Sequence, residues 1–254
     1  NLADKLASLN LHDAALMWQA RAENHDSKNI DAPLLAAVLH MKKGNFNEAN
    51  AALERAIALD AENPDIYKNY GQLNSERENP ESALEAYDMA LSLSADDTKI
   101  FNQRGRLLLK MGQKERAAKD FQRILDLEQT YVYRPYTPFA LYFLGRAKEA
   151  AARMDSIMAK GDDEQAYNAA CIYALCGNKQ QALTYLERAL KSRKYTDFDN
   201  IDTDSDLDGL RDDADFKALV KQYRDAWEAH LAAERKLLDP RITEKQKSNS
   251  TTVK

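Results

Sequence analysis

Hydrophobic positions recur along the middle of the chain with the spacing of amphipathic helices. Ala49 is followed by Leu53 four residues later and by Ala56 after three more, a stripe that occupies one face of an α-helix. The same stripe begins again at Ala83 and at Ala117, each time 34 residues further on. A fixed period of this length predicts stacked units that each consist of a short helical hairpin.

Comparison of longer segments shows that these stripes belong to variants of one repeated sequence. Four segments align closely, at residues 44–60, 78–94, 112–128 and 177–193. A looser copy runs from Gly145 to Ile157. Each stripe belongs to the second helix of a hairpin, and a first helix precedes it. The first helix carries Tyr67 and Gly71 in one repeat and Phe101 and Gly105 in the next. Small residues at the glycine position allow two helices to approach closely, and we expect the glycine at the turn of each hairpin to adopt a left-handed conformation.

An aromatic residue, a glycine and two alanines at these offsets in a 34-residue unit resemble the tetratricopeptide repeat family, over roughly residues 30–193. The resemblance implies an all-α fold, a right-handed superhelical solenoid of stacked antiparallel helical hairpins. We expect one domain over residues 1–238. It comprises a degenerate capping hairpin at 1–29, about five repeats at 30–194, and an acidic loop and capping helix at 195–238. Residues 239–254 lack apolar periodicity and are interpreted as a tail or linker.

Two segments depart from the repeat. Pro135 and Pro138 fall inside the first helix of the fourth repeat, where proline removes a hydrogen bond and clashes with the preceding turn. We therefore expect a shortened helix that begins near Thr137 or Pro138. After the repeats, an apolar stripe between residues 212 and 237 predicts an amphipathic helix that covers the open end of the stack.

Composition agrees with this fold and excludes several function classes. Apolar residues make up 44% of the 254 residues, charged residues 30%, and there are only 8 Gly and 6 Pro, too few for many short strands. A net charge of −5 without a basic stripe argues against nucleic acid as a partner, and the absence of an 18-residue apolar run argues against membrane insertion.

The sequence leaves the cellular compartment open. Because the chain begins at Asn1, it is compatible with a cytoplasmic protein and with an exported one whose signal peptide has been removed. Cys171 and Cys176 define neither a disulfide framework nor a zinc site, so the compartment stays open.

The sequence contains no motif of a known enzyme class. No nucleophile elbow, phosphate loop, zinc-binding helix or dinucleotide fingerprint is present. The four histidines are scattered over separate helices: His12, His25, His40 and His230. We therefore expect no catalytic residue and no cofactor. A protein or peptide remains as the expected partner, and the oligomeric state is not indicated.

Polar residues at first-helix positions are the main candidates for binding. In the tetratricopeptide family these positions line a concave surface, and here they hold Lys68, Asn69, Gln72, Lys99, Asn102, Gln103 and Arg106. Cations and amides in a row suit an extended peptide, because they bind carboxylates and backbone groups. A solvated polar face without a ligand is the alternative. The two-carboxylate clamp of chaperone-binding members is not reproduced in either register.

Aromatic residues gather around the two prolines. Six lie within thirteen residues: Tyr131, Tyr133, Tyr136, Phe139, Tyr142 and Phe143. We expect Phe139 and Phe143 to belong to the core, whereas Tyr133 and Tyr136 are candidates for an apolar pocket beside the polar row. They could equally fill the gap left by the shortened helix.

An acidic segment follows the last repeat. Asp204, Asp206, Asp208 and Asp215 have the spacing of a calcium loop, in which alternate oxygens converge on one cation. The match is incomplete, because Arg211 stands at an aliphatic position and no incoming helix is expected before Asp204. The alternative, which we favour, is that the aspartates cap helices while Leu207, Leu210 and Phe216 anchor the segment in the core.

These observations favour a non-catalytic interaction module that binds a peptide segment of another protein and acts as a scaffold or adaptor. One alternative is an N-terminal accessory domain of a larger enzyme that continues beyond Lys254. A second is a calcium-modulated repeat array based on the acidic segment.

Overall fold

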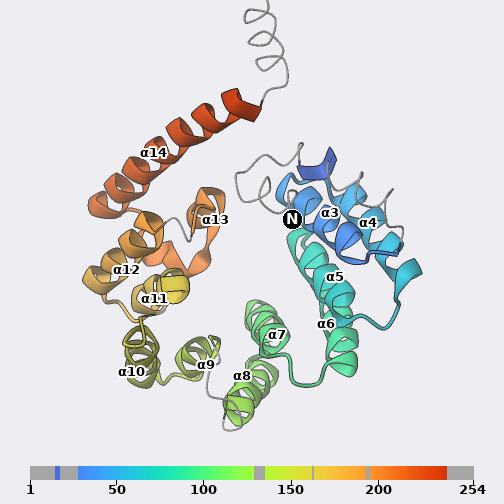
Figure 1. Cartoon of the computed structure of the whole chain (residues 1–254). Coiled ribbons are helices and arrows are strands. Elements are labelled where there is room, and N and C mark those ends of the chain that lie inside the picture. The colour runs from blue at the N-terminus through green and yellow to red at the C-terminus, as the bar shows by residue number, and fades with distance from the viewer. Residues whose placement is uncertain (1–14, 18–27, 129–134, 162, 193–194, 239–254) are drawn as a thin grey trace, which may run out of the picture. The chain divides into compact units, whose positions relative to one another are not determined.

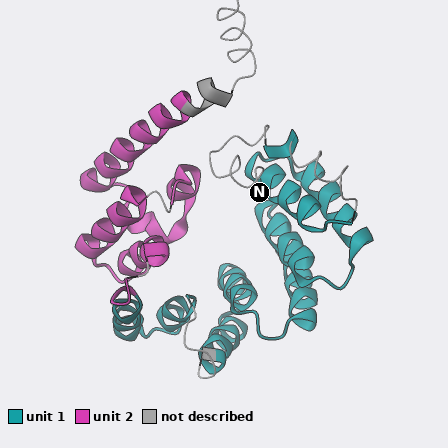
Figure 2. Cartoon of the chain, viewed as in Figure 1, with its two compact units in different colours: residues 1–157 teal, residues 158–254 magenta. Residues whose placement is uncertain are grey.

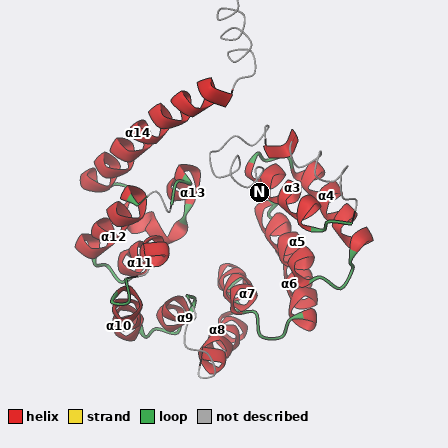
Figure 3. Cartoon of the chain, viewed as in Figure 1, coloured by secondary structure: helices red, strands yellow, loops and turns green. Residues whose placement is uncertain are grey.

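The computed structural model describes residues 15–17, 28–128, 135–161, 163–192 and 195–238, and these residues form helices joined by short loops without a strand among them (Figure 3). The chain divides into two compact units, residues 1–157 and 158–254 (Figure 2). The predicted all-α fold of stacked helical hairpins is confirmed.

Unit 1 is a series of helices in chain order (Figure 1). They are α3 (Asp31–Lys42), α4 (Phe46–Leu59), α5 (Pro64–Glu76), α6 (Pro80–Leu93), α7 (Thr98–Lys110), α8 (Lys114–Glu128), α9 (Thr137–Phe143) and α10 (Ala147–Met158). Helices α3 and α4, α5 and α6, and α7 and α8 form hairpins, and each second helix also contacts the first helix of the next hairpin. The stacking predicted from the 34-residue period is therefore present.

The core of unit 1 lies between the helices of these hairpins. The alanines that begin the stripes, Ala49, Ala83 and Ala117, are fully buried. Gly71 of α5 lies against the ring of Tyr87 on α6, and Gly105 of α7 lies against Phe121 on α8. The small first-helix residue is thus what allows a large second-helix ring into the hairpin.

The turns inside the hairpins depend on backbone conformation. Gly44, Gly112 and Gly145 have φ angles of 71°, 74° and 79°, in the left-handed region that glycine adopts without steric cost. The α5–α6 hairpin has Glu78 at this position, with a φ of 58°. This hairpin therefore makes the same turn with a residue that is strained there.

The fourth repeat begins as the prolines predict. Helix α9 starts at Thr137, carries Pro138 in its first turn and is only seven residues long. The predicted shortening is confirmed, because a proline is tolerated in the first turn, where its missing N–H would have no intrahelical partner.

Unit 2 contains the fifth hairpin and the segment that follows it (Figure 1). Its elements are the 3₁₀ helix η1 (Asp163–Gln165), α11 (Ala166–Leu175), α12 (Lys179–Lys191), α13 (Phe198–Thr203), the 3₁₀ helix η2 (Ser205–Leu210) and α14 (Ala214–Leu238). Helices α11 and α12 pair, η2 packs on α11, and the closing helix α14 packs on α12. No helix was expected before Asp204, and this is wrong, because α13 occupies Phe198–Thr203. Asp197 caps α13 by accepting a hydrogen bond from the Asn200 backbone N–H.

Some expectations concern residues that the structure does not describe. Ala14, Trp18, most of the capping hairpin at 1–29, Tyr131, Tyr133 and the tail at 239–254 lie outside the described residues. Within the described part, Ala15 is buried beside Leu39 of α3. No helix in that part combines the length and apolarity that crossing a membrane requires.

Candidate functional site

The polar residues predicted to bind a peptide lie on α5 and α7. We call Lys68, Asn69, Gln72, Lys99, Asn102, Gln103 and Arg106 the first-helix row. Asp97 caps α7 by accepting hydrogen bonds from the backbone N–H groups of Lys99 and Ile100, which places Lys99 in the first turn of the helix. Lys68 is ion-paired with Asp65, three residues earlier on α5.

The charge of one lysine of the first-helix row acts on a second lysine from the next hairpin. Burial lowers the pKa of the Lys99 ammonium, and the positive charge of Lys68 lowers it further, while Asp97 and Asp65 act in the opposite direction. Lys99 is nevertheless exposed to solvent, so protein atoms cover only one side of its side chain. An anion placed between the two ammonium groups would relieve their repulsion.

The row was expected to lie on an exposed face, and its observed exposure differs at several positions. Asn102 is buried, with 7% of its surface exposed, so the expectation that it is exposed is wrong. Lys68, Asn69 and Arg106 are half-buried, and Lys99 is exposed as expected. Asn102 is one of seven buried residues of α7, a helix that contacts both α6 and α8.

Two amide side chains of the row lack partners. The Oδ1 atom of Asn102 and the Oε1 atom of Gln103 are buried and accept no hydrogen bond from any described residue. Gln72 instead donates from its amide to Glu76 on the same helix, at 2.9 Å. An acceptor that is buried without a donor costs free energy, so the two oxygens reduce the stability of the fold and are not accessible to a ligand.

The aromatic residues of α9 continue the row. The guanidinium of Arg106 lies over the ring of Phe143 at 5.3 Å from its centroid, and this ring stacks on Phe121 at 5.0 Å. Phe139 is buried in the core as expected. Tyr136 is half-buried and packs against the same core cluster, and burial together with the charge of Asp97 raises the pKa of its hydroxyl.

A different arginine on α7 is committed to the fold. Arg104 donates to both oxygens of Asp120 on α8, at 2.9 and 2.6 Å, and to Asp88 on α6 at 2.5 Å. Since Asp120 is only 4% exposed, the Arg104–Asp120 pair fastens the two helices of one hairpin, and the bond to Asp88 joins this hairpin to α6 of the preceding one. Arg104 is therefore not part of the first-helix row, which the sequence assigned to Arg106 alone.

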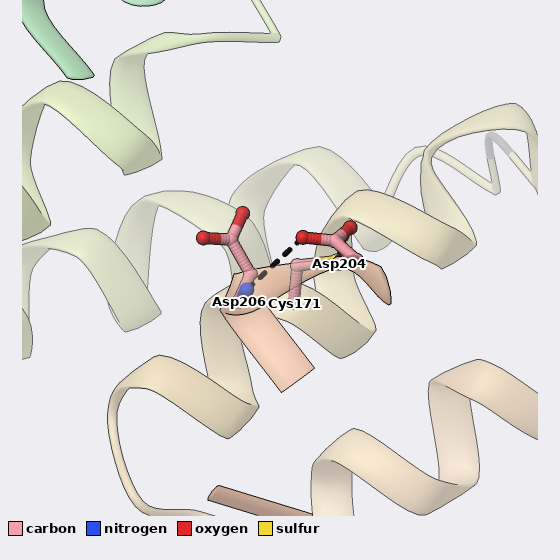
Figure 4. Close-up of side chains that lie close together, drawn as sticks. All are labelled: Cys171, Asp204 and Asp206. Carbon is pink, nitrogen blue, oxygen red and sulfur yellow. Dashed lines mark hydrogen bonds between the residues drawn. The ribbon is translucent and has the colours of Figure 1, made fainter. Parts of the chain in front are cut away.

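The acidic segment of unit 2 brings two of its four candidate carboxylates close together. Asp204 and Asp206 lie beside Cys171 of α11, with ligand atoms within 4.8 Å of one another, the one such group of metal-ligating residues found in the described ranges (Figure 4). The Oδ1 atom of Asp204 accepts the backbone N–H of Asp206 at 3.0 Å (Figure 4). Its Oδ2 atom accepts the hydroxyl of Tyr167 at 2.8 Å. Asp204 thereby caps η2, as the helix-capping interpretation expects.

The other two candidates are engaged elsewhere. Asp208 pairs with Arg211 at 2.8 Å, and Asp215 pairs with Lys179 of α12 at 2.8 Å. Asp213, which the sequence did not single out, caps α14 by accepting hydrogen bonds from the backbone N–H groups of Asp215 and Phe216. The anchors Leu207, Leu210 and Phe216 are buried. Calcium binding by this segment stays the alternative interpretation, and the capping arrangement does not require a metal.

Sequence analysis missed an aromatic and amide cluster next to Asp204. The rings of Tyr167 and Tyr195 stack at 3.7 Å between centroids, and Asn200 donates from its amide to both hydroxyls. Burial raises the pKa of both tyrosines, so the cluster is neutral. No periodicity or motif signals it, because its members come from α11, the segment before α13, and α13 itself.

Comparisons with known proteins agree with the repeat architecture. Sequence profiles described as tetratricopeptide repeat match residues 34–98, 98–131 and 166–195, half of the chain in total. A curated relative, a chloroplastic protein of Arabidopsis thaliana, is 40% identical over 88 residues. This match covers 33% of the present chain and 26% of the relative, so the chain corresponds to about a quarter of that protein's length.

Solved structures agree as well. A tetratricopeptide repeat protein from Parabacteroides merdae matches with a TM-score of 0.50 at 16% identity, covering 89% of this chain and 96% of its own. The tetratricopeptide repeat protein TTC0263 of Thermus thermophilus matches with a TM-score of 0.49 at 21% identity, covering 62% and 87%. The first likeness shows a shared fold. Together with the sequence profiles, the stacked hairpins and the turn conformations, it establishes that the chain belongs to the tetratricopeptide repeat family.

Proposed function

We propose that the chain is a non-catalytic protein-interaction scaffold whose first-helix row binds an extended, carboxylate-bearing segment of a partner protein. Tetratricopeptide repeats are protein-interaction modules, which supports the general part of this proposal. The choice of the first-helix row as the binding surface for carboxylates depends on one observation. Lys68 and Lys99, from successive hairpins, lie close enough that the charge of one lowers the pKa of the other.

The chemistry of the row favours a backbone together with acidic side chains. Lys68, Lys99 and Arg106 offer charge-assisted hydrogen bonds to carboxylates, while the amide of Asn69, half-buried on the same helix as Lys68, suits backbone groups. An extended segment presents both kinds of group at short intervals. Tyr136, half-buried at the start of α9, provides apolar surface at the end of the row.

The test replaces Lys99 and Arg106 together with alanine. We expect the melting temperature to stay nearly unchanged, because incompletely buried charges contribute little to stability. The affinity for a fluorescein-labelled peptide of alternating glycine and glutamate should fall by about 1–3 kcal/mol, as expected for hydrogen bonds to charged groups. Fluorescence anisotropy measures this loss, and the same peptide with glutamine in place of glutamate should bind weakly to the unsubstituted protein.

A matched control removes the same charge outside the row. Lys114 and Lys119 are exposed on α8, so their double replacement by alanine should leave peptide affinity within about twofold of the original. A pull-down from the native organism extends the test to real partners. If the Lys99 and Arg106 double variant retains every partner and binds the acidic peptide as before, the row is not the binding site.

A further inference from the structure

A small cavity in unit 2 lies apart from the first-helix row. It has a volume of about 190 Å³ and is enclosed by the end of α12, the segment before α13 and one face of α14. Its main lining residues are Leu190, Lys191, Tyr195, Phe198, Tyr223 and Trp227. Four aromatic side chains around one cavity of this size form a dense apolar surface, and we call it the aromatic pocket.

Other contacts hold the walls of the aromatic pocket in place. Tyr195 is stacked on Tyr167 with the ring planes 2° apart, and Phe198 lies under the guanidinium of Arg224 at 5.5 Å. The hydroxyl of Tyr223 donates to Glu187 of α12 at 3.3 Å. Because each of these rings already has a partner behind it, filling the pocket requires little additional ordering of its walls.

The volume of the pocket selects the size of the occupant. Ligand sites for drug-sized molecules span about 300–1,000 Å³, whereas an apolar cavity of roughly 150 Å³ accommodates benzene. The aromatic pocket, at about 190 Å³, therefore fits one apolar side chain of a polypeptide, such as phenylalanine or leucine, and is too small for a larger ligand.

The rim of the pocket carries a cation. Lys191 is exposed, and no carboxylate within the described ranges forms an ion pair with it. The indole N–H of Trp227, on the same wall, is buried and has no acceptor among the described residues. Lys191 thus places one exposed cation beside an apolar interior, and the complementary ligand is an apolar side chain next to an acidic one.

We propose that the aromatic pocket receives a single apolar side chain of a partner polypeptide, with an adjacent acidic residue held by Lys191. This second docking point goes beyond the first-helix row, because all of its residues belong to unit 2. It does not depend on the row being a binding site.

Three short probes separate the parts of the proposal. The acidic phenylalanine probe is Ac-Gly-Asp-Phe-Asp-Gly-NH₂, the second has alanine in place of phenylalanine, and the third has asparagine in place of both aspartates. The readout is the indole N–H resonance of Trp227 in a ¹H–¹⁵N spectrum. The chain has two tryptophans, and Trp227→Phe identifies which signal belongs to this one.

We expect the acidic phenylalanine probe to shift the Trp227 resonance saturably. The alanine probe should bind at least tenfold more weakly, because it loses the burial of a large apolar side chain. Lys191→Gln should weaken the acidic phenylalanine probe about threefold and leave the asparagine probe unchanged. Lys217→Gln, a loss of an exposed cation elsewhere on α14, should change none of the three affinities.

A variant that fills the aromatic pocket tests directly whether the probe binds there. Ala226 lines the pocket and is exposed, so Ala226→Phe should fill the cavity without disturbing the core and should abolish the shift. The Lys99 and Arg106 double variant of the first-helix row should respond to the probes like the unsubstituted protein, so failure of one site is distinguishable from failure of the other. Equal binding of the phenylalanine and alanine probes, or an unchanged shift in Ala226→Phe, would overturn the proposal. So would concentration-dependent movement of the resonance without a probe, since a second copy of the chain would then be the occupant.

Discussion

The contact between Gly71 and Tyr87 gives a sharp test of how the hairpins pack. A Cβ atom added at Gly71 would overlap three ring carbons of Tyr87, the farthest at 2.7 Å, whereas carbon atoms pack at about 3.5–4.0 Å. The ring cannot move away easily, because Tyr87 is only 3% exposed. We therefore expect Gly71→Ala to destabilise the α5–α6 hairpin and the hairpins stacked on it.

The magnitude follows from two opposing effects. Overpacking of a core typically costs about 1–3 kcal/mol, while replacing glycine with alanine inside a helix gains about 1 kcal/mol. The ring carbons at Gly71 are closer than those at Gly105, so the overpacking cost dominates there, and the net loss should be about 1–2 kcal/mol. At Gly105 the nearest ring carbons of Phe121 are at 2.9 Å, so smaller adjustments suffice and Gly105→Ala should be close to neutral.

Gly209 in η2 supplies the control. A Cβ atom there meets nothing within 4 Å and φ is not positive, so Gly209→Ala should be neutral or slightly stabilising. Urea unfolding followed by circular dichroism gives the three free energies of unfolding. The expected order of stability is Gly209→Ala, then Gly105→Ala, then Gly71→Ala. If Gly71→Ala is as stable as Gly209→Ala, the close approach of α5 and α6 is not what requires the glycine.

The other predictions concern a turn, an ion pair and a titration. Glu78→Gly should raise the free energy of unfolding by about 1 kcal/mol because it removes left-handed strain, whereas Gly112→Ala at the equivalent turn should lower it by a similar amount. In urea unfolding, a fall for Glu78→Gly or a rise for Gly112→Ala would contradict the turn argument. Asp120→Ala should cost about 1–3 kcal/mol in the same measurement, since Arg104 loses both of its hydrogen bonds to a buried carboxylate, and a loss below about 0.5 kcal/mol would show that the pair is dispensable. Because burial and a neighbouring charge lower the pKa of Lys99, its ammonium is lost at a lower pH than that of an ordinary lysine, so acidic-peptide affinity should decline as the pH rises through that value. Lys99→Arg, which stays charged, should flatten this pH profile, and an equal decline in both proteins would refute the role of Lys99.

The repeat register came directly from the sequence, and the structure agrees with it. Helix packing imposes a strict requirement for a small residue wherever two helices approach closely, so alanine and glycine recur every 34 residues, as at Ala49 and Ala83 and at Gly71 and Gly105. The shortened α9 was predictable for a similar reason, because Pro138 is compatible with the first turn of a helix and not with its interior. These features depend on backbone sterics within one hairpin, so short sequence patterns predict them.

The sites depended on contacts that no local pattern records. Spacing placed Asn102 in the exposed row, whereas the tertiary structure buries it, since its exposure depends on how neighbouring hairpins cover α7. The hydrogen bonds between Arg104 and Asp120 on α8 were not indicated by any sequence motif, because they depend on how the two helices pack. The aromatic pocket was not anticipated, because its residues are brought together by the packing of α14 on α12.

The amino-acid sequence by itself therefore determined the fold family, the hairpin boundaries and the residue types at each helix contact, because these follow from periodicity and backbone sterics. The tertiary structure decided which polar side chains stay accessible and which are consumed by the fold. It also decided where Cys171 meets Asp204 and Asp206, since residues more than 30 positions apart approach only when the post-repeat segment packs on α11. The physical reason is that helix formation depends on neighbours along the chain, whereas burial and pairing of charges depend on neighbours in space.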